Sequence, residues 1–288
     1  MVRILSLLCL FLFVIQLPVL AGPQKETPRA IVSDDFTNAR PQPKPRPNSA
    51  GHVRKSSRTY HLASTATVRP ARSFGIDPLQ LGVTFWKLQR AGFSSLESRR
   101  PALQFLATRV EADTPFHPGD LLRLSIESPR AGYLYVIDRD WFTDESSAET
   151  NLIFPVRGDD NRLYPGRLID IPAEDRNPFR ADPKPNQAGE LLTIIVTSSP
   201  LPLPISSKPL RISTEQLLEW TRRWNTLTDR FEMNDGAGQT RTSEERQAAV
   251  RKGMRQLTRD DPAPQTIYVV TPSSRDGVLF NLLLSYVP

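Results

Sequence analysis

Apolar and polar residues alternate along several short segments of this chain, and prolines and glycines separate these segments. Strict alternation over residues 122–127 (Leu-Arg-Leu-Ser-Ile-Glu) predicts a half-buried β-strand with one face in water. Residues 133–137 and 190–197 are apolar on both faces, which predicts strands buried in the sheet. Comparable short runs predict further strands at residues 82–88, 103–110, 151–154, 167–172, 266–270 and 278–287.

This succession of short strands and turns, without alternating strands and helices, predicts a mainly β fold. We expect an antiparallel, immunoglobulin-like β-sandwich. The prolines support this expectation because they lie at the ends of the predicted strands and not within the buried runs. In the last predicted strand the apolar residues share one face: Val278, Phe280, Leu282, Leu284 and Tyr286.

A helical pattern interrupts the strands, so we expect the sandwich to carry a two-helix insertion near residues 213–258. Ser213 and Gln216 form a capping box at the start of the first helix, and residues 243–257 are the second. We expect the apolar stripe of the first helix to pack on the sandwich, although a partner-binding or carbohydrate-binding face has the same pattern. This stripe consists of Leu217, Trp220, Trp224, Leu227 and Phe231.

The N-terminus predicts a signal peptide over residues 1–21. Arg3 precedes an apolar run, and small residues near Ala21 suit a cleavage site. The run ends before the roughly 20 residues that a membrane-spanning helix needs. We therefore expect an exported protein, periplasmic or secreted, whose mature chain has no transmembrane helix.

Residues 22–78 are rich in proline and carry almost all of the excess positive charge, which predicts a disordered basic linker. Residues 22–73 contain ten Lys and Arg against three Asp and Glu. We expect a solvated spacer, or weak electrostatic contact with the anionic cell envelope. The remainder, residues 79–288, is expected to form the β-sandwich domain, with closing strands at 266–287. Its charge is balanced, which together with export argues against nucleic-acid binding.

Residue types exclude several classes of chemistry. Cys9 is the only cysteine and lies in the predicted signal peptide, so disulfides, thiol catalysis and cysteine-bound zinc are excluded from the mature chain. His117 is the only histidine after the linker and lies in a predicted turn without a nucleophile motif nearby. The chain has no glycine-rich phosphate loop and no zinc-ligand spacing, so we expect no cofactor.

An acidic segment follows the predicted strand at 133–137 and is the candidate partner-binding loop. Its aromatic residues lie among charges, where packing explains them less readily than binding does. An EF-hand is excluded because Phe142 and Thr143 occupy the fifth and sixth positions, although a calcium site of another kind, built from the aspartates, stays open. The candidate residues are Asp138, Asp140, Trp141, Phe142 and Asp144.

Several short motifs follow one another in a fixed order. They are LGVTFWKL at 81–88, PGD at 118–120, GYLYVID at 132–138, LIFP at 152–155, DNR at 160–162, IDIP at 169–172 and GE at 189–190. Over residues 81–197 this order resembles the bacterial family called domain of unknown function 4384 (DUF4384). The resemblance implies an accessory or recognition role, because other members attach this domain to kinases or caspase-like peptidases. It implies no catalytic residues. We expect no attached kinase or peptidase domain here, because the sequence has neither a kinase HRD motif nor a cysteine nucleophile.

We therefore expect a non-catalytic binding or structural module of the bacterial envelope, with a protein or glycan partner. The alternative is a secreted hydrolase that cleaves glycan or peptide with two carboxylates, chosen from the acids of the 138–145 segment and Asp159 and Asp160. Convergent acids with raised pKa in a cleft favour the enzyme. A filled core and an aromatic loop end favour the binding module.

Overall fold

The computed structural model describes residues 28–43, 77–90, 105–144, 148–233, 236–241 and 255–287. The predicted signal peptide of residues 1–21 and most of the second predicted helix lie outside these ranges. Within them, neither helix has the length and apolar character required to cross a membrane.

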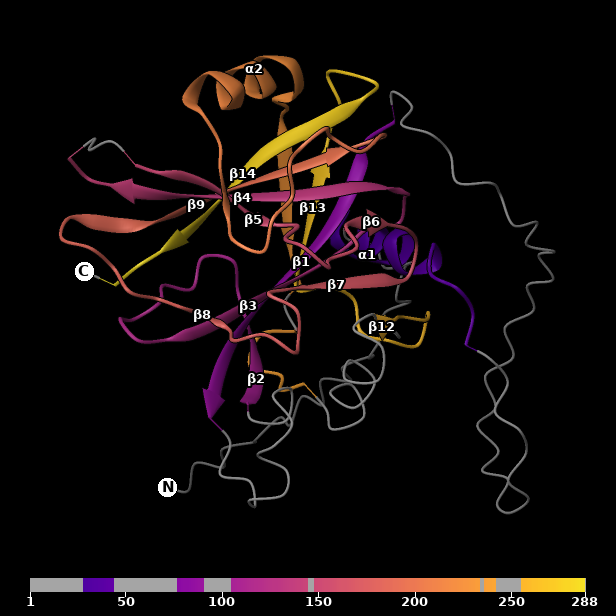
Figure 1. The fold of residues 1–288 in the computed structure, drawn as a ribbon. Coiled ribbons are helices and arrows are strands. Elements are labelled where there is room, and N and C mark those ends of the chain that lie inside the picture. The colour runs from indigo at the N-terminus through magenta and orange to yellow at the C-terminus, as the bar shows by residue number, and fades with distance from the viewer. Residues whose placement is uncertain are drawn as a thin grey trace, which may run out of the picture.

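The described strands form two antiparallel sheets packed face to face, which confirms the predicted mainly β sandwich (Figure 1). The larger sheet has eight described strands. In spatial order these are β11 (Thr228–Glu232), β13 (Thr266–Val270), β1 (Leu79–Arg90), β3 (Leu121–Glu127), β7 (Arg167–Ile171) and β12 (Arg255–Gln256), with β2 (Phe105–Val110) beside β1 and β8 (Phe179–Arg180) beside β3.

The smaller sheet has six described strands, and the long hydrogen-bonded ladders of its centre hold it together. β4 pairs with β9 from Tyr133↔Thr197 to Phe142↔Gln187. The spatial order is β10 (Leu210–Arg211), β5 (Thr150–Phe154), β4 (Gly132–Phe142), β9 (Gln187–Thr197) and β14 (Gly277–Ser285), with β6 (Arg162–Leu163) beside β4.

Alternate residues of each strand fill the space between the sheets, because successive side chains of a strand point to opposite faces. From the larger sheet, β1 buries Leu81, Val83 and Phe85 in this core. From the smaller sheet, β14 and the residue after it bury the five residues that were predicted to share one face: Val278, Phe280, Leu282, Leu284 and Tyr286.

Helix α2 (Thr214–Trp224) lies across the outer face of the six-stranded sheet (Figure 1). The Ser213 hydroxyl caps it by accepting a hydrogen bond from the backbone N–H of Gln216 at 3.2 Å, as predicted. Trp220 and Trp224 stack with ring centroids 6.2 Å apart and are buried. The core interpretation is therefore confirmed for both tryptophans, which pack in a cluster with Tyr135, Ile137, Leu152, Ile195, Ile212 and Leu279.

The first predicted helix is shorter than its apolar stripe suggested, so two stripe residues were assigned wrongly. Leu227 follows the helix and is 88% exposed, and Phe231 belongs to strand β11. The chain leaves the helix after Asn225, whose backbone is extended, and then pairs with β13. Hydrogen bonding to an open sheet edge outweighs a helical spacing of apolar residues here. Within the second predicted helix, Arg255–Gln256 is likewise a strand, β12, paired with β7.

The predicted wet face of β3 is also wrong. Arg123, Ser125 and Glu127 point away from the core, yet each is at most 3% exposed. Residues 236–241 and 255–265 cover this outer face of the eight-stranded sheet, and they contribute partners such as Arg241. Alternation in sequence reports which residues face the core, but not whether further chain covers the other side.

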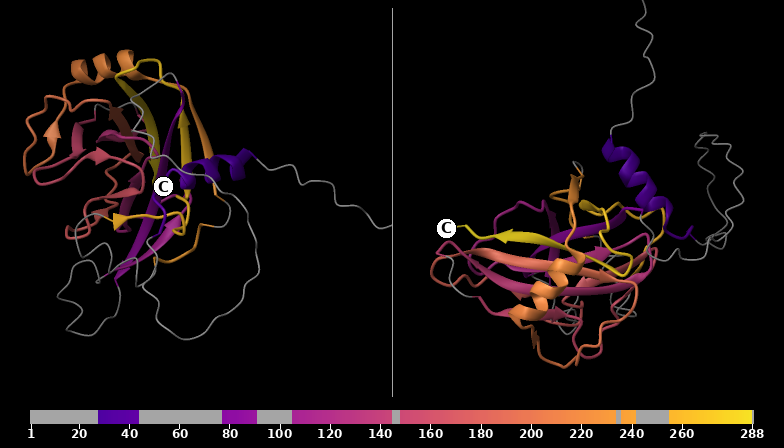
Figure 2. Two further views of the ribbon diagram at one scale, coloured as in Figure 1. Left: turned by 90° about the vertical axis from the view of Figure 1, so that its right-hand side faces the viewer. Right: turned by 90° about the horizontal axis from the view of Figure 1, so that it is seen from above.

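A third difference concerns residues 28–43, where the prediction of a disordered linker is wrong. They form helix α1 (Pro28–Asn38) and a short extension that pack on the covered face of the eight-stranded sheet (Figure 2). Phe36 and Arg40 are buried at 1% and 2% exposure. Average composition missed this because two anchoring side chains are enough to dock a segment that is otherwise polar.

The α2 packing gives a test of fold stability. Replacing Trp224 by Ala removes a buried ring and its hydrogen bond to Asp276, so we expect a loss of about 3–5 kcal/mol in the free energy of unfolding. Leu218 is on the same helix but 47% exposed, so Leu218→Ala is the matched control. It should lower the free energy of unfolding by about 0.5 kcal/mol or less. Urea denaturation measures both, and equal losses would contradict the packing role of α2.

Candidate functional site

The predicted partner-binding loop is mostly a strand. Asp138, Asp140, Trp141 and Phe142 belong to β4, and only Asp144 lies in the turn after it. The loop prediction failed because β9 begins at Gln187, earlier than expected, and its backbone pairs with β4 up to Phe142. Backbone pairing therefore decides the conformation of a segment whose side chains resemble those of a loop.

The strand geometry separates the candidate residues onto two faces. Asp138 and Asp140 lie on the inner face toward the other sheet, and Trp141 lies on the outer face with 45% of its surface exposed. A bulge follows Trp141, and Phe142 is half-buried. The five predicted residues thus do not form one binding surface, and Trp141 is the exposed aromatic among them.

Two carboxylates do converge on the inner side of this sheet end. Asp138 and Glu190 line a cavity of about 20 Å³ between the sheets, together with apolar side chains such as Phe85 and Leu124. Burial raises the pKa of Asp138 to about 7, and the negative charges of Glu190 and Asp140 add to this rise. Asp138 Oδ1 is buried and has no hydrogen-bond partner among the described residues.

Glu190 is held in place by a neighbouring strand. The Tyr286 hydroxyl donates a hydrogen bond to its carboxylate. Burial raises the pKa of Glu190, and the nearby Asp140 carboxylate adds to the effect. Paired acids with raised pKa are the feature that the hydrolase alternative requires.

The other acids of this end are tied to basic and amide groups. Lys184 Nζ lies 2.6 Å from Asp140 Oδ2, and Gln187 Nε2 donates to Asp140 Oδ1 at 2.9 Å. Asn186 Nδ2 donates to Asp144 Oδ2 at 3.2 Å. Within the described ranges no three acidic or histidine side chains are grouped closely enough to hold a metal ion. The calcium alternative therefore has no support in this geometry.

Asp159 and Asp160 lie at the opposite end of β4 from this cavity, next to β6, and so cannot complete a pair with its acids. Arg176 Nη2 lies 2.8 Å from Asp159 Oδ1. Arg162 hydrogen bonds to Asp160 and lowers the pKa of that carboxyl to about 2. Both acids therefore form salt bridges with arginines.

His117 lies in the turn before β3 with 64% of its side chain exposed, as predicted. Its backbone N–H donates to Asp120 Oδ2 at 2.9 Å, and its Nδ1 lies 3.8 Å from the same oxygen. This is the geometry of a turn stabilised by an aspartate.

A groove of about 470 Å³ lies beside α2. One wall is the extended segment 198–203, whose position is fixed by a 2.7 Å hydrogen bond from Leu201 N to the Tyr135 hydroxyl. The other wall consists of side chains of α2 that are spaced three and four residues apart: Gln216, Glu219, Trp220 and Arg223.

The carboxylate of Asp276, which lines this groove, is paired with neighbouring donors. Asp276 accepts hydrogen bonds from the Ser274 hydroxyl, from Trp224 Nε1 at 3.2 Å and from Arg223. These contacts lower the pKa of Asp276, the Ser274 hydroxyl having the largest effect. The groove is therefore lined by aromatic, proline and paired polar groups. Sequence reasoning missed it because its signal, alternating prolines over 200–204 beside a helix stripe, resembles that of a simple loop.

A second polar cluster lies under residues 236–241, on the outer face of the eight-stranded sheet. Arg241 hydrogen bonds to Asp170 at 3.0 Å and to Glu174, and its guanidinium lies 4.5 Å from the centre of the Trp86 ring. Burial alone would raise the pKa of Asp170, but Arg241 and Arg123 hold it below its usual value. These paired charges fasten the covering chain to the sheet.

The buried acid near the 20 Å³ cavity predicts a pH dependence of stability. Because the pKa of Asp138 is about 7 in the folded state against 3.8 unfolded, stability is lost as the pH rises through about 7. Asp138→Asn should reduce the fall in unfolding free energy between pH 5 and pH 8 by roughly 2 kcal/mol. Urea titrations at both pH values measure this fall, with the exposed Asp144→Asn as the control. If Asp138→Asn and the wild type lose the same unfolding free energy between the two pH values, the prediction is wrong.

Comparison with known proteins adds no further assignment. No family model, no curated protein and no solved structure matches this chain. The resemblance to DUF4384 therefore stays a prediction from the motifs of residues 81–197.

Proposed function

We propose that the protein is an exported, non-catalytic binding module of the bacterial envelope, and that the groove beside α2 receives its ligand. The observation that carries this proposal is a contrast of size. The groove measures about 470 Å³, within the range of roughly 300–1,000 Å³ typical of ligand sites. The cavity at the paired acids measures about 20 Å³, enough for a single water molecule.

This contrast weighs against the alternative, a carboxylate-dependent hydrolase. Asp138 and Glu190 have the raised pKa that a general acid needs, and this is the observation in its favour. A sugar ring or a peptide bond cannot enter a space of one water molecule. In the groove itself, Asp276 has a lowered pKa and is held by Arg223 and Trp224, so it is poorly suited to donate a proton.

The lining of the groove suits a ligand with both apolar and hydrogen-bonding groups. Proline and leucine side chains of residues 200–203 form an apolar wall, and Gln216, Glu219 and Arg223 provide donors and acceptors on the facing helix. Extended peptides and glycans both have this mixed character, in agreement with the expected protein or glycan partner of the envelope.

Export and envelope contact rest on the sequence. The predicted signal peptide of residues 1–21 supports a periplasmic or secreted location. Residues 44–73 carry seven Lys and Arg and no Asp or Glu, which supports weak electrostatic contact with anionic envelope surfaces. The accessory role implied by the resemblance to DUF4384 agrees with a binding module.

Filling the groove tests the proposal. Ser199 lies on the groove wall and is exposed, so Ser199→Trp should occupy the space without disturbing the core. Ser207→Trp, an exposed serine outside the groove lining, is the matched control. Arrays of envelope glycan fragments and extended peptides, followed by biolayer interferometry, should show a ligand whose affinity falls at least about tenfold with Ser199→Trp only.

Two outcomes would overturn the proposal. One is an equal affinity of the wild type and Ser199→Trp for every bound probe, or no bound probe at all. The other is turnover of a glycan or peptide probe that Asp138→Asn and Glu190→Gln abolish, which would establish the hydrolase instead.

A further inference from the structure

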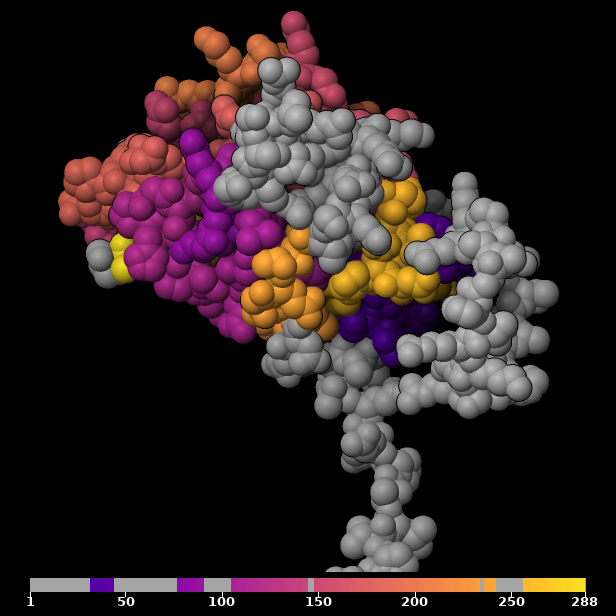
Figure 3. All heavy atoms as spheres, turned by 90° about the horizontal axis from the view of Figure 1, so that it is seen from below, coloured from indigo at the N-terminus to yellow at the C-terminus, as the bar shows by residue number. Residues whose placement is uncertain are grey.

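The N-terminal arm, residues 28–43, docks into a slot on the side of the sandwich away from the α2 groove. In Figure 3 the arm lies directly against residues 255–265. The slot is formed by β1 and β3 below and by residues 257–264 at the side. Its contacts with the arm select particular side chains of the arm.

Arg40 makes the central contact, with 1% of its side chain exposed. Its Nη2 and Nε donate to the two carboxylate oxygens of Glu127, at 2.6 and 3.0 Å. Its Nη1 and Nη2 also donate to the backbone carbonyls of Asp261 at 2.7 Å and Pro262 at 3.1 Å. A planar guanidinium satisfies this arrangement of acceptors, and an ammonium group does not.

The slot also binds the backbone of the arm. Arg259 Nε donates to the carbonyl of Arg40, and Arg259 N donates to the carbonyl of Pro41, each at 3.2 Å. Contacts to consecutive carbonyls fix the direction and register of the bound segment, as in other sites that recognise extended peptides.

Two glycines shape the slot for the neighbouring side chains of the arm. A Cβ on Gly82 would lie 2.7 Å from the ring of Phe36, and a Cβ on Gly166 would lie 2.5 Å from Pro41 Cδ. The backbone therefore leaves room for an aromatic residue, and for a proline five positions later.

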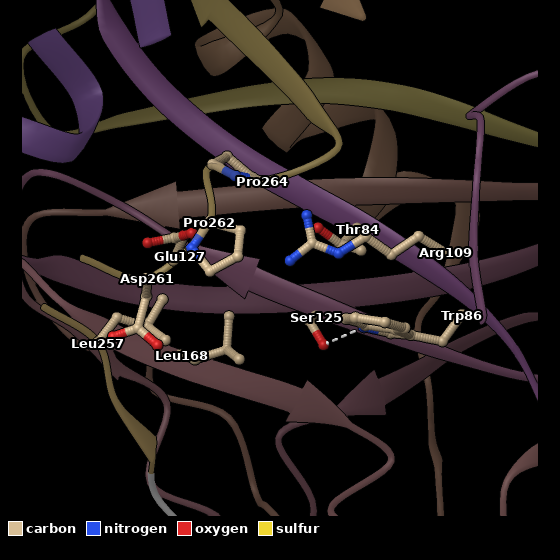
Figure 4. Close-up of a pocket in the computed structure, with 10 residues that line it drawn as sticks. All are labelled: Thr84, Trp86, Arg109, Ser125, Glu127, Leu168, Leu257, Asp261, Pro262 and Pro264. Atoms are coloured by element: carbon tan, nitrogen blue, oxygen red, sulfur yellow. Dashed lines mark hydrogen bonds between the residues drawn. The ribbon is translucent and has the colours of Figure 1, made fainter. Parts of the chain in front are cut away.

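A small cavity of about 20 Å³ lies next to the Arg40 site (Figure 4). Glu127, Asp261 and Pro262 line one side of it, and Trp86 and Arg109 line the other. The Arg40 site is thus a polar recess in the covering layer, and not a part of the apolar core between the sheets.

The arm joins the sandwich covalently through residues 44–76, and the side chain of Arg40 donates hydrogen bonds to Glu127 and to residues 258–262 of the sandwich. In such an arrangement the arm is a tethered ligand, and its occupancy reflects the high effective concentration that the tether provides. A segment with the same anchors on a separate molecule presents the same groups to the slot.

We propose that this slot is a peptide-binding site for segments of the type Phe-x-x-x-Arg-Pro, filled in cis by the chain's own arm and able to take the same segment from a second copy of this chain. This site is separate from the α2 groove, because it lies on the other sheet. Arg provides the charge recognition, and Phe and Pro provide the fit.

The experiment uses the chain expressed without residues 1–21, with a specific protease site inserted between residues 60 and 61. After cleavage, native mass spectrometry should show the N-terminal fragment still bound. A fluorescent synthetic peptide of residues 28–43 should then displace it, measured as a rise in anisotropy. A peptide with Arg40→Ala should bind about 100-fold more weakly or worse, and one with Arg40→Lys about tenfold more weakly.

A peptide with Gln42→Ala is the matched control, because Gln42 is exposed, and it should compete as well as the natural sequence. Three results would overturn the proposal: a fragment that never exchanges, equal affinity for the natural and Arg40→Ala peptides, or loss of β-sheet circular dichroism when the fragment leaves. The last result would make the arm an integral part of the fold.

Discussion

The fold depends on pairing a row of polar side chains that β3 turns away from the core: Arg123, Ser125 and Glu127. A charge removed from water costs several kcal/mol unless a partner of opposite charge and further hydrogen bonds replace the water. The chain brings those partners from distant positions, Arg241 near Ser125 and Arg40 on Glu127. Residues 236–241 meet this requirement from within the sandwich, and the docked N-terminal arm adds a further partner for Glu127.

The outer face of the six-stranded sheet is different in kind. It is apolar at the end that α2 covers, and the aromatic side chain of Trp141 is exposed at the other end. Helix α2 buries the apolar end with Trp220 and Trp224, and the edge of that packing leaves the groove that we assign to a ligand. Trp141 lies on the same face at the uncovered end. The groove that we propose as the ligand site thus lies on the outside of this sheet, whereas Asp138 and Glu190 at its inner side line a cavity with apolar walls.

Much of the β framework could be predicted from the sequence, because strand periodicity and turn residues are local signals. The shared face of Val278 to Tyr286 and the cap at Ser213 are examples. The site could not be predicted in the same way. Whether Asp138 lies in a loop or a strand depends on the length of β9, and whether Glu127 meets water depends on Arg40, 87 positions away in sequence. These are contacts between distant segments, on which local pattern is silent.

The path of the chain also decides how the molecule bears mechanical load. Pro41 and Asp77 both accept hydrogen bonds from the sandwich, so the chain is anchored on either side of residues 44–76. If the N-terminus is held and the domain is pulled, the Arg40–Glu127 contact carries the force before β1 does. Its rupture would release the arm and leave the hydrogen-bonded ladders of both sheets in place. A pull on the N-terminus would therefore meet the Arg40–Glu127 contact before it reached the strands of the sandwich.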